Sequence, residues 1–307
     1  MRQACLKTVF EIAKKDKKIL FIGSDLGPNV LKEFKTKFPK RFFIEGVAEQ
    51  SVIGMASGLA LSGFKPYVNT ISTFITRRCF EQVVVDVCLH NLPVTLIGNG
   101  GGLVYAPLGP THQAIEDISI MRTLPNMTVI SPCDANEMTE IVKQSRNFKS
   151  PIYIRIARGG EKIITNKKKI KIGKSVILKK IKKINILTTG IMAQKAIEVA
   201  NKLRTKKIDV GVIHFSTVKP LDKKTLNKIL KNSENCFTLE ENVIAGGFGS
   251  AVLEYASLVN FKTPKIKIFG IKDKFIDKYG NQEELLNYSR LDVKSIMNNI
   301  LKFINKK

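Results

Sequence analysis

Four side chains that could do chemistry stand just after predicted strands. They are an acid, an aromatic ring, an imidazole and a guanidinium: Glu49, Phe74, His112 and Arg158. In parallel α/β sheets, ligands bind beyond the carboxyl ends of the strands, so these groups should meet at one rim. The acid can exchange protons and the guanidinium can hold an oxyanion in a bidentate manner. Together they predict a pocket for an anionic ligand.

Glu49 begins a helix of small, apolar residues that runs to Gly63. A helix that is apolar all round is expected to be buried. Gly54 and Gly58 weaken it unless another backbone or a ligand packs closely there. Glu49 is therefore expected at the start of a buried helix, beside something held tightly. A first-turn acid stabilised by the helix dipole would explain the same residue without any function.

His112 is a weaker signal by itself, because a single histidine is often a satisfied structural residue. It stands at the end of a long glycine-rich loop that spans 99–110, after Gly109-Pro110-Thr111. Functional side chains are common on such loops, which favours a functional role.

Composition narrows the function classes. The net charge of +25 comes mainly from lysines without interleaved aromatic residues, so we expect a basic surface and no nucleic-acid binding. Anionic small substrates or an acidic partner would suit that surface.

No apolar run approaches the ~18 residues of a membrane span, and no signal-peptide block opens the chain, which predicts a cytoplasmic protein with no membrane contact. The five scattered cysteines predict reduced thiols and no disulfide, and no zinc or other metal site.

The alternation of strands and helices predicts an α/β fold with two doubly wound domains, 1–160 and 173–307, joined by a lysine-rich linker at 159–173. The strands predicted in the first domain are 18–23, 41–44, 65–69, 93–98, 127–130 and 150–156. Helices are expected from Glu49, from about 76 to 90, from about 114, and after Asp134, which can cap with Glu137. The second domain is predicted to contain strands 184–187, 208–213 and 235–239, and a helix at 192–203. We interpret Gly246–Gly249 as a strand-to-helix turn because no lysine or ribose-binding acid completes a nucleotide motif.

Several motifs resemble those of the transketolase family. In the first part they are Gly46-Val47-Ala48-Glu49-Gln50, Ser72-Thr73-Phe74, Gly109-Pro110-Thr111-His112-Gln113 and Leu124-Pro125-Asn126-Met127, which are similar to the pyrimidine-binding domain of transketolases and deoxyxylulose-phosphate synthases. In the second part they are Thr189-Gly190, Lys219-Pro220-Leu221-Asp222, Glu240-Glu241-Asn242 and Gly246-Gly247-Phe248-Gly249-Ser250. The resemblance implies a pyrimidine-binding domain followed by a transketolase C-terminal-like domain.

The resemblance implies thiamine diphosphate as the cofactor. Glu49 would hydrogen-bond N1′ of the aminopyrimidine and promote the tautomer that removes the thiazolium C2 proton. That role needs a carboxyl that is protonated or shares a proton, which a buried apolar setting favours. Phe74 would stack on the pyrimidine, and Asp25 and Leu26 would lie near the cofactor.

The same resemblance assigns substrate contacts. His112 would contact the hydroxyls or carbonyl oxygen of a sugar phosphate, and Arg158 its phosphate group. Arg2 matches a further phosphate-contacting arginine.

A partner subunit is also implied. In this family a Gly-Asp-Gly motif followed by Asn holds the diphosphate and Mg²⁺, and the sequence contains no Gly-Asp-Gly. We therefore expect the C-terminal subunit of a split transketolase, with Mg²⁺ held by an N-terminal partner subunit and a two-plus-two heterotetramer as the assembly.

Departures from the family pattern fall in the substrate pocket. An aspartate that reads a donor hydroxyl is replaced by Leu108, a histidine of the phosphate site by Gly100, and a serine of the same subsite by Asn29. The donor and acceptor sugars are therefore left open.

Two alternatives to ketol transfer remain. One is another thiamine-dependent reaction, such as a deoxyxylulose-phosphate-synthase-like carbon–carbon bond formation from pyruvate. The β subunit of a 2-oxoacid dehydrogenase belongs to this group, but the Thr-His-Gln loop argues against it. The other alternative is a non-catalytic partner subunit, against which Glu49 and Phe74 argue.

Overall fold

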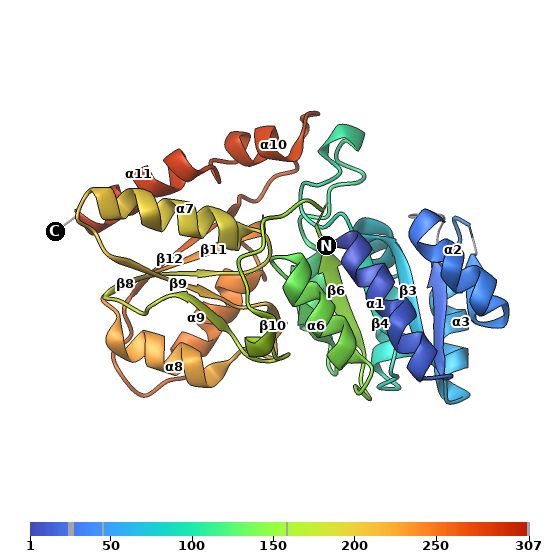
Figure 1. Ribbon diagram of the computed structural model, residues 1–307. Helices are drawn as coiled ribbons and strands as arrows, with labels where there is room; N and C mark the ends of the chain where they lie inside the picture. Colours follow the sequence, from blue (N-terminus) through green and yellow to red (C-terminus); the bar gives the residue numbers. More distant parts are fainter. Residues whose placement is uncertain (24–27, 45, 158, 306–307) are drawn as a thin grey trace.

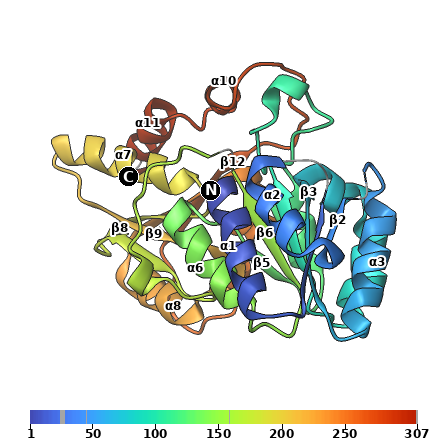
Figure 2. The same ribbon diagram turned by 45° about the vertical axis from the view of Figure 1, so that its right-hand side comes forward.

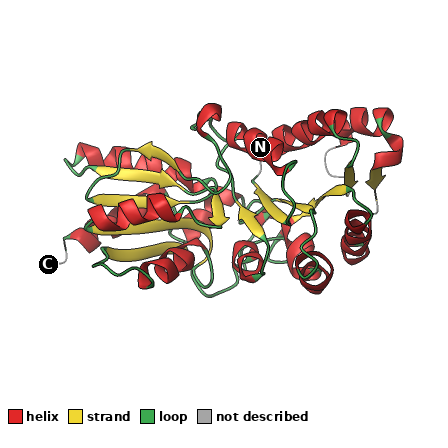
Figure 3. Ribbon diagram, turned by 90° about the horizontal axis from the view of Figure 1, so that it is seen from below, coloured by secondary structure: helices red, strands yellow, loops and turns green. Residues whose placement is uncertain are grey.

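Two sheets stand side by side in the computed structural model, which describes residues 1–23, 28–44, 46–157 and 159–305 (Figure 1). Figure 3 shows helices on both faces of the strands in each half. This is the α/β fold with two doubly wound parts predicted from the sequence. Among the described residues, no helix is long and apolar enough to cross a bilayer.

The first sheet has seven strands in the order β10-β5-β6-β4-β3-β1-β2. Its strands are β1 (Ile19–Gly23), β2 (Phe42–Ile44), β3 (Lys65–Ile71), β4 (Thr95–Asn99), β5 (Thr128–Ile130), β6 (Ile152–Ile156) and β10 (Thr217–Lys219). Neighbours pair in parallel except β10, which pairs antiparallel with β5. β1, β4 and β6 are buried along their whole length, as expected for parallel strands covered on both faces.

The helices of the first half lie on both faces of this sheet. They are α1 (Arg2–Lys15), α2 (Pro28–Lys37), α3 (Glu49–Leu61), α4 (Phe80–Gln82), α5 (Asp117–Thr123) and α6 (Ala135–Ser145). Two π-helical segments, Phe74–Arg78 and Val83–Cys88, flank α4, where the sequence predicted one continuous helix. The Asp134 carboxylate accepts a hydrogen bond from the Glu137 amide at 2.9 Å, which confirms the predicted cap of α6.

The second sheet has five strands in the order β12-β11-β8-β9-β7. They are β7 (Val176–Lys179), β8 (Ile184–Thr188), β9 (Val210–His214), β11 (Asn235–Val243) and β12 (Lys265–Ile271), and only β7 is antiparallel to its neighbour. The helices of this half are α7 (Met192–Thr205), α8 (Lys223–Asn232), α9 (Phe248–Ser257), α10 (Gln282–Tyr288) and α11 (Val293–Ile304). The division into 1–160 and 173–307 stays a prediction, and β10 is a strand of the second part that joins the first sheet.

The turn at Gly246–Gly249 wraps a carboxylate of the chain itself. Glu240 accepts hydrogen bonds from the amides of Phe248 at 2.7 Å and Gly249 at 2.8 Å, at the start of α9. Burial raises the pKa of Glu240 to about 7, and the two amides partly offset this. An internal anion thus takes the place at the helix N-terminus that a nucleotide phosphate would need, which fits the structural interpretation.

One expectation about α3 is wrong for this chain. The helix covers the sheet with residues such as Val52, Ile53 and Ala56, but its other face is exposed, with Leu61 66% accessible. No atom lies within 4 Å of where a Cβ would stand on Gly54 or Gly58. The helix lies at the outer edge of the molecule, away from the second sheet (Figure 2). Its small, apolar outer face is therefore left uncovered by this chain.

Candidate functional site

The predicted acid and aromatic ring meet at one guanidinium. Glu49, in the first turn of α3, is only 6% accessible. Arg78 donates a hydrogen bond from Nη1 to Glu49 Oε2 at 2.8 Å. The Arg78 Cζ also lies 4.0 Å from the centre of the Phe74 ring, within cation–π distance. Glu49 thus accepts a hydrogen bond from the guanidinium of Arg78, and the Phe74 ring packs against the same group.

The local backbone explains why Phe74 and Arg78 act together. Both belong to the π-helical segment that follows β3. π-helical turns are rare and occur often at functional sites. Here only Ser72 and Thr73 separate the segment from the carboxyl end of β3, and the segment carries both side chains towards the start of α3.

His112 joins this cluster from the loop after β4. Its ring centre lies 5.1 Å from that of Phe74 in an edge-to-face arrangement, and the Thr111 hydroxyl lies 2.9 Å from His112 Nδ1. Partial burial lowers the pKa of His112, and the positive charges of Arg78 and Arg77 lower it further. The imidazole is therefore kept neutral to lower pH than a free histidine, and can hydrogen-bond without carrying charge.

A pocket of about 480 Å³ opens beside this cluster. Its lining includes Thr73, Phe74, Arg78, Pro110, Thr111 and Phe275. Phe275 comes from the second half of the chain, so both halves contribute to the wall. The structure thus brings together Glu49, Phe74 and His112, three of the four residues that the sequence placed at one rim. Arg158, Asp25 and Leu26 lie outside the described residues.

A second pocket of about 240 Å³ contains two of the three positions that depart from the family pattern, Gly100 and Leu108. Arg2, Gly100, Tyr105, Leu108, Asn281 and Gln282 are among its lining residues. Gly100 has φ +71°, and a Cβ built on it would lie 2.0 Å from the Tyr105 ring. Tyr105 therefore fills the space where a side chain at position 100 would stand. Leu108 is 50% exposed. Asn29 is the second residue of α2.

Tyr105 and Arg2 are close enough to affect each other. Burial raises the pKa of Tyr105, and the charge and a hydrogen bond of Arg2 oppose that shift. A phenol and a guanidinium would thus face any ligand in this pocket.

A buried ionic network supports the loop that carries His112. Arg155 of β6 lies 3.1 Å from Asp117 at the start of α5, and the Tyr153 hydroxyl donates to Asp117 at 2.6 Å. Arg155 also donates to the backbone oxygens of Ala114 and Glu241, each at 2.9 Å. The network ties the end of the loop to both sheets and fixes where His112 can stand.

Sequence reasoning missed Arg78, Tyr105 and Arg155. A signal for Arg78 was present, because it stands four residues after Phe74 and so on the same side of a helical segment. Arg155 was signalled too, since it is the only charge within the apolar run Ile152–Ile156. Tyr105 had no comparable signal, because its contact with Gly100 depends on the path of the loop.

Comparison with known proteins places both halves of the chain. Residues 1–160 match the family "Transketolase, pyrimidine binding domain", and residues 173–296 match "Transketolase, C-terminal domain". A solved structure described as "Split gene transketolase, inactive beta4 tetramer" superposes with a TM-score of 0.88 at 32% identity, covering 98% of this chain and 96% of that one. Transketolase from Campylobacter jejuni gives a TM-score of 0.78 at 20% identity, covering 97% of this chain and 46% of that one, which indicates a shared fold.

Curated relatives include two 1-deoxy-D-xylulose-5-phosphate synthases. The enzyme of Clostridium perfringens (strain SM101) is 38% identical over 300 residues, which are 96% of this chain and 48% of that enzyme. The enzyme of Caldanaerobacter subterraneus subsp. tengcongensis is 40% identical over 298 residues, 96% of this chain and 47% of that enzyme. The chain spans about half the length of the curated relatives it matches. It belongs to the transketolase family, of which it carries the pyrimidine-binding and C-terminal domains.

Proposed function

We propose that this chain is the C-terminal catalytic subunit of a split, thiamine diphosphate-dependent transketolase that transfers a two-carbon ketol unit between sugar substrates. The observation that carries the proposal is the position of Arg78 between Glu49 and Phe74. A guanidinium is flat, rich in nitrogen and able to donate hydrogen bonds. An aminopyrimidine that presents a protonated or proton-sharing ring nitrogen has the same character, so the residues present fit the cofactor.

Each residue of the cluster has a role in this proposal. When bound, thiamine diphosphate supplies an electron sink for carbon–carbon bond cleavage and formation. Glu49 would share a proton with the aminopyrimidine N1′, and Phe74 would support the ring by stacking. Arg78 would have to leave its place on both. Neutral His112 would hydrogen-bond a hydroxyl or carbonyl oxygen of the substrate.

The partner belongs to the same proposal. Since the sequence has no Gly-Asp-Gly motif, residues outside it would hold the diphosphate and Mg²⁺. The uncovered face of α3, with Gly54 and Gly58 open to close approach, supports an N-terminal transketolase subunit as the second chain. A similar protein described as a split-gene transketolase and found as a β4 tetramer also supports self-association, here in a two-plus-two assembly.

The substrate pocket supports a donor or acceptor other than the usual pentose phosphates. Leu108 offers no acceptor for a donor hydroxyl, and Tyr105 occupies the space beside Gly100 where the family pattern has a histidine. Asn29 departs at the same subsite. Arg2, with Arg158, would still hold an anionic group. A site without a hydrogen-bonding partner for a hydroxyl loses selectivity for it.

A deoxyxylulose-phosphate-synthase-like reaction is the second candidate. The two curated relatives described above, at 38% and 40% identity over 96% of this chain, are such synthases, which supports this reaction over the remaining thiamine reactions. Leu108 cannot hydrogen-bond a donor hydroxyl, so a donor without that hydroxyl, such as pyruvate, would suit this pocket.

The test is a donor and acceptor panel on the chain assembled with an N-terminal transketolase subunit, with Leu108→Asp as the matched variant. We expect low turnover of xylulose 5-phosphate with ribose 5-phosphate, and higher turnover with a less hydroxylated or non-phosphorylated donor. Leu108→Asp should shift preference towards the ketopentose phosphate by roughly tenfold or more, the effect of one added hydrogen bond to a substrate. Efficient turnover of both pentose phosphates by the unchanged complex would contradict the substrate proposal. If the complex carries out neither ketol transfer nor pyruvate condensation with any donor, that result would contradict the proposed function.

A further inference from the structure

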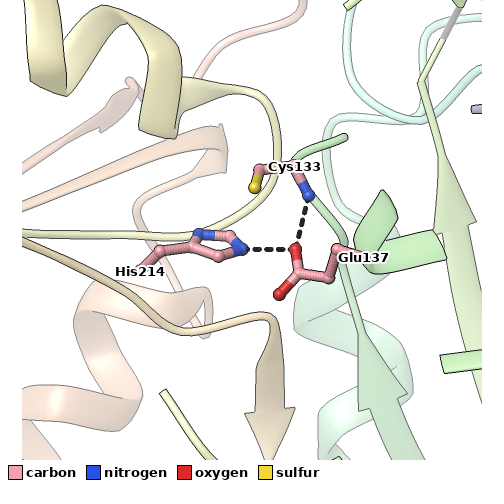
Figure 4. Close-up of side chains that lie close together, drawn as sticks. All are labelled: Cys133, Glu137 and His214. Carbon is pink, nitrogen blue, oxygen red and sulfur yellow. Dashed lines mark hydrogen bonds and ion pairs between the residues drawn. The ribbon is translucent and has the colours of Figure 1, made fainter. Parts of the chain in front are cut away.

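A compact group of three metal-ligating side chains lies at the seam between the two sheets, apart from the site above. Cys133 follows β5, Glu137 belongs to α6 and His214 ends β9 (Figure 4). Cys133, Glu137 and His214 are all fully buried. The cluster thus joins the first sheet to the second at a point that solvent does not reach.

The contacts within this cluster are close. His214 Nε2 lies 2.8 Å from Glu137 Oε2, and the same oxygen accepts a hydrogen bond from the Cys133 amide at 2.8 Å. The imidazole nitrogen, the carboxylate oxygen and the Cys133 thiol sulfur all lie within 4.8 Å of one another. Figure 4 shows the His214 ring nitrogen and the Cys133 amide both facing the same oxygen of Glu137.

Two polar atoms of the cluster lack partners among the described residues. Glu137 Oε1 and His214 Nδ1 are both buried, and neither has a hydrogen-bond partner there. Buried polar atoms are nearly always paired, so the unpaired Glu137 Oε1 indicates that a further ligand belongs beside this carboxylate.

We propose that Cys133, Glu137 and His214 form a zinc site that fastens the two halves of the chain together. Sulfur, imidazole nitrogen and carboxylate oxygen are the ligands that Zn²⁺ takes in proteins, and softer thiolate selects against Mg²⁺ and Ca²⁺. A thiolate, a carboxylate and a neutral imidazole carry two negative charges in total, which balance the ion in a buried setting. Cys133 would bind as the thiolate, so uptake of zinc releases one proton from the protein.

The geometry needs only small movements. Zinc bonds of about 2.0–2.3 Å place tetrahedral ligand atoms roughly 3.3–3.8 Å apart. The imidazole and the carboxylate would therefore separate slightly from 2.8 Å, and the sulfur would move inward from a distance of at most 4.8 Å. The second oxygen of Glu137 or one water would complete four ligands.

The surroundings suit a fastening role. Ser131 donates to the Ser216 oxygen at 2.7 Å, and Gly190 donates to the Ser131 oxygen at 3.0 Å, so the backbones of the two halves already meet beside the cluster. Sequence spacing indicated no zinc site because 81 positions separate Cys133 from His214. Only the fold brings them together.

The experiment uses the full chain and the metal alone. Zinc is titrated in competition with a chromophoric chelator, and thermal unfolding is followed with zinc and with chelator. We expect one zinc per chain, and an unfolding midpoint that rises with zinc concentration, because the ion binds only the folded form. Cobalt in place of zinc should give a thiolate charge-transfer absorption band, a readout that needs no variant.

Variants locate the site. Cys133→Ser keeps the size of the side chain, and His214→Asn removes the imidazole; each should weaken zinc binding at least 100-fold. Cys88→Ser, another buried thiol, and His90→Asn, an exposed histidine, are the matched controls and should stay within twofold of the unchanged chain. No stoichiometric zinc uptake, or uptake that survives Cys133→Ser, would overturn the inference and leave the cluster as a hydrogen-bonded contact. If both variants unfold, the cobalt spectrum of the unchanged chain decides.

Discussion

Arg78 links three residues of the candidate site through one charge. It donates to Glu49, lies over the Phe74 ring and contributes to the lowered pKa of His112. The Arg78 guanidinium, whose charge helps to keep His112 neutral, therefore also occupies the place proposed for the aminopyrimidine.

Removing this charge should raise the pKa of His112. In Arg78→Gln, a protonated His112 is no longer repelled by the positive charge at position 78, so the charged form of the imidazole is less disfavoured. Arg77→Gln should raise the same pKa by less, because Arg77 is the smaller of the two charge effects. The titration is followed by the imidazole proton resonances in NMR, and with three histidines in the chain, His112→Asn identifies the signal.

An unchanged His112 pKa in Arg78→Gln would contradict the arrangement. The same result would leave burial and Arg77 as the causes of the lowered pKa of His112.

The loop between β4 and α5 depends on the buried pair of Arg155 and Asp117. Asp117→Asn should lower the free energy of unfolding by about 3–5 kcal/mol, because it leaves the Arg155 charge buried without its partner. Glu116→Gln is the matched control, since its pair with Arg77 is partly exposed, and it should cost less than about 1 kcal/mol. Urea unfolding of both variants gives the comparison.

Equal stability losses in the two variants would mean that the buried pair does not support this loop. A large loss in Asp117→Asn alone would agree with the network described here. It should also bring altered chemical shifts at His112, because the loop carries that residue.

The sequence predicted the elements well where apolar runs are continuous. β1, β4 and β6 were found within two residues of their predicted starts, and the rim shared by Glu49, Phe74 and His112 follows from parallel pairing alone. β10 and β7 were not predicted, because a three-residue strand and an antiparallel edge strand carry little periodicity. β12, Lys265–Ile271, was not predicted either. The Glu49–Arg78 pair was missed as well, since it depends on a π-helical turn that propensity does not reveal.

At the scale of the whole molecule, α3 has an outer face that no other part of the described chain covers. The helix presents Gly54, Gly58 and Leu61 outward at the edge of the first half, beside the acid that the proposal makes catalytic. Small residues permit close packing of another backbone, and an apolar face of this kind is typical of an interface. Cofactor binding should therefore depend on the assembled complex.

Gly58→Trp tests this dependence. The indole should fit the isolated chain, where nothing lies within 4 Å of the Cβ position, but obstruct a partner packed on α3. We expect the isolated chain to bind thiamine diphosphate weakly, and the complex with an N-terminal transketolase subunit to bind it tightly with Mg²⁺. Gly58→Trp should weaken association with that subunit at least tenfold, measured by calorimetry and sedimentation.

Lys206→Trp, exposed at the end of α7, is the control for adding an indole to the surface. Tight, Mg²⁺-dependent cofactor binding by the isolated chain would contradict the account of a divided site. Unchanged association in Gly58→Trp would show that the partner packs elsewhere.

The most direct test of the central claim is hydrogen–deuterium exchange at C2 of thiamine diphosphate in the assembled complex, compared between the unchanged chain and Glu49→Gln. Glutamine keeps the shape of the side chain but cannot share a proton with N1′, so the fold and assembly should persist. Because a positioned acid–base group typically contributes about 10²–10⁴-fold, we predict that the exchange rate falls by at least about 100-fold. Exchange in Glu49→Gln near the rate of the unchanged complex would contradict the assignment of Glu49 and the function built on it.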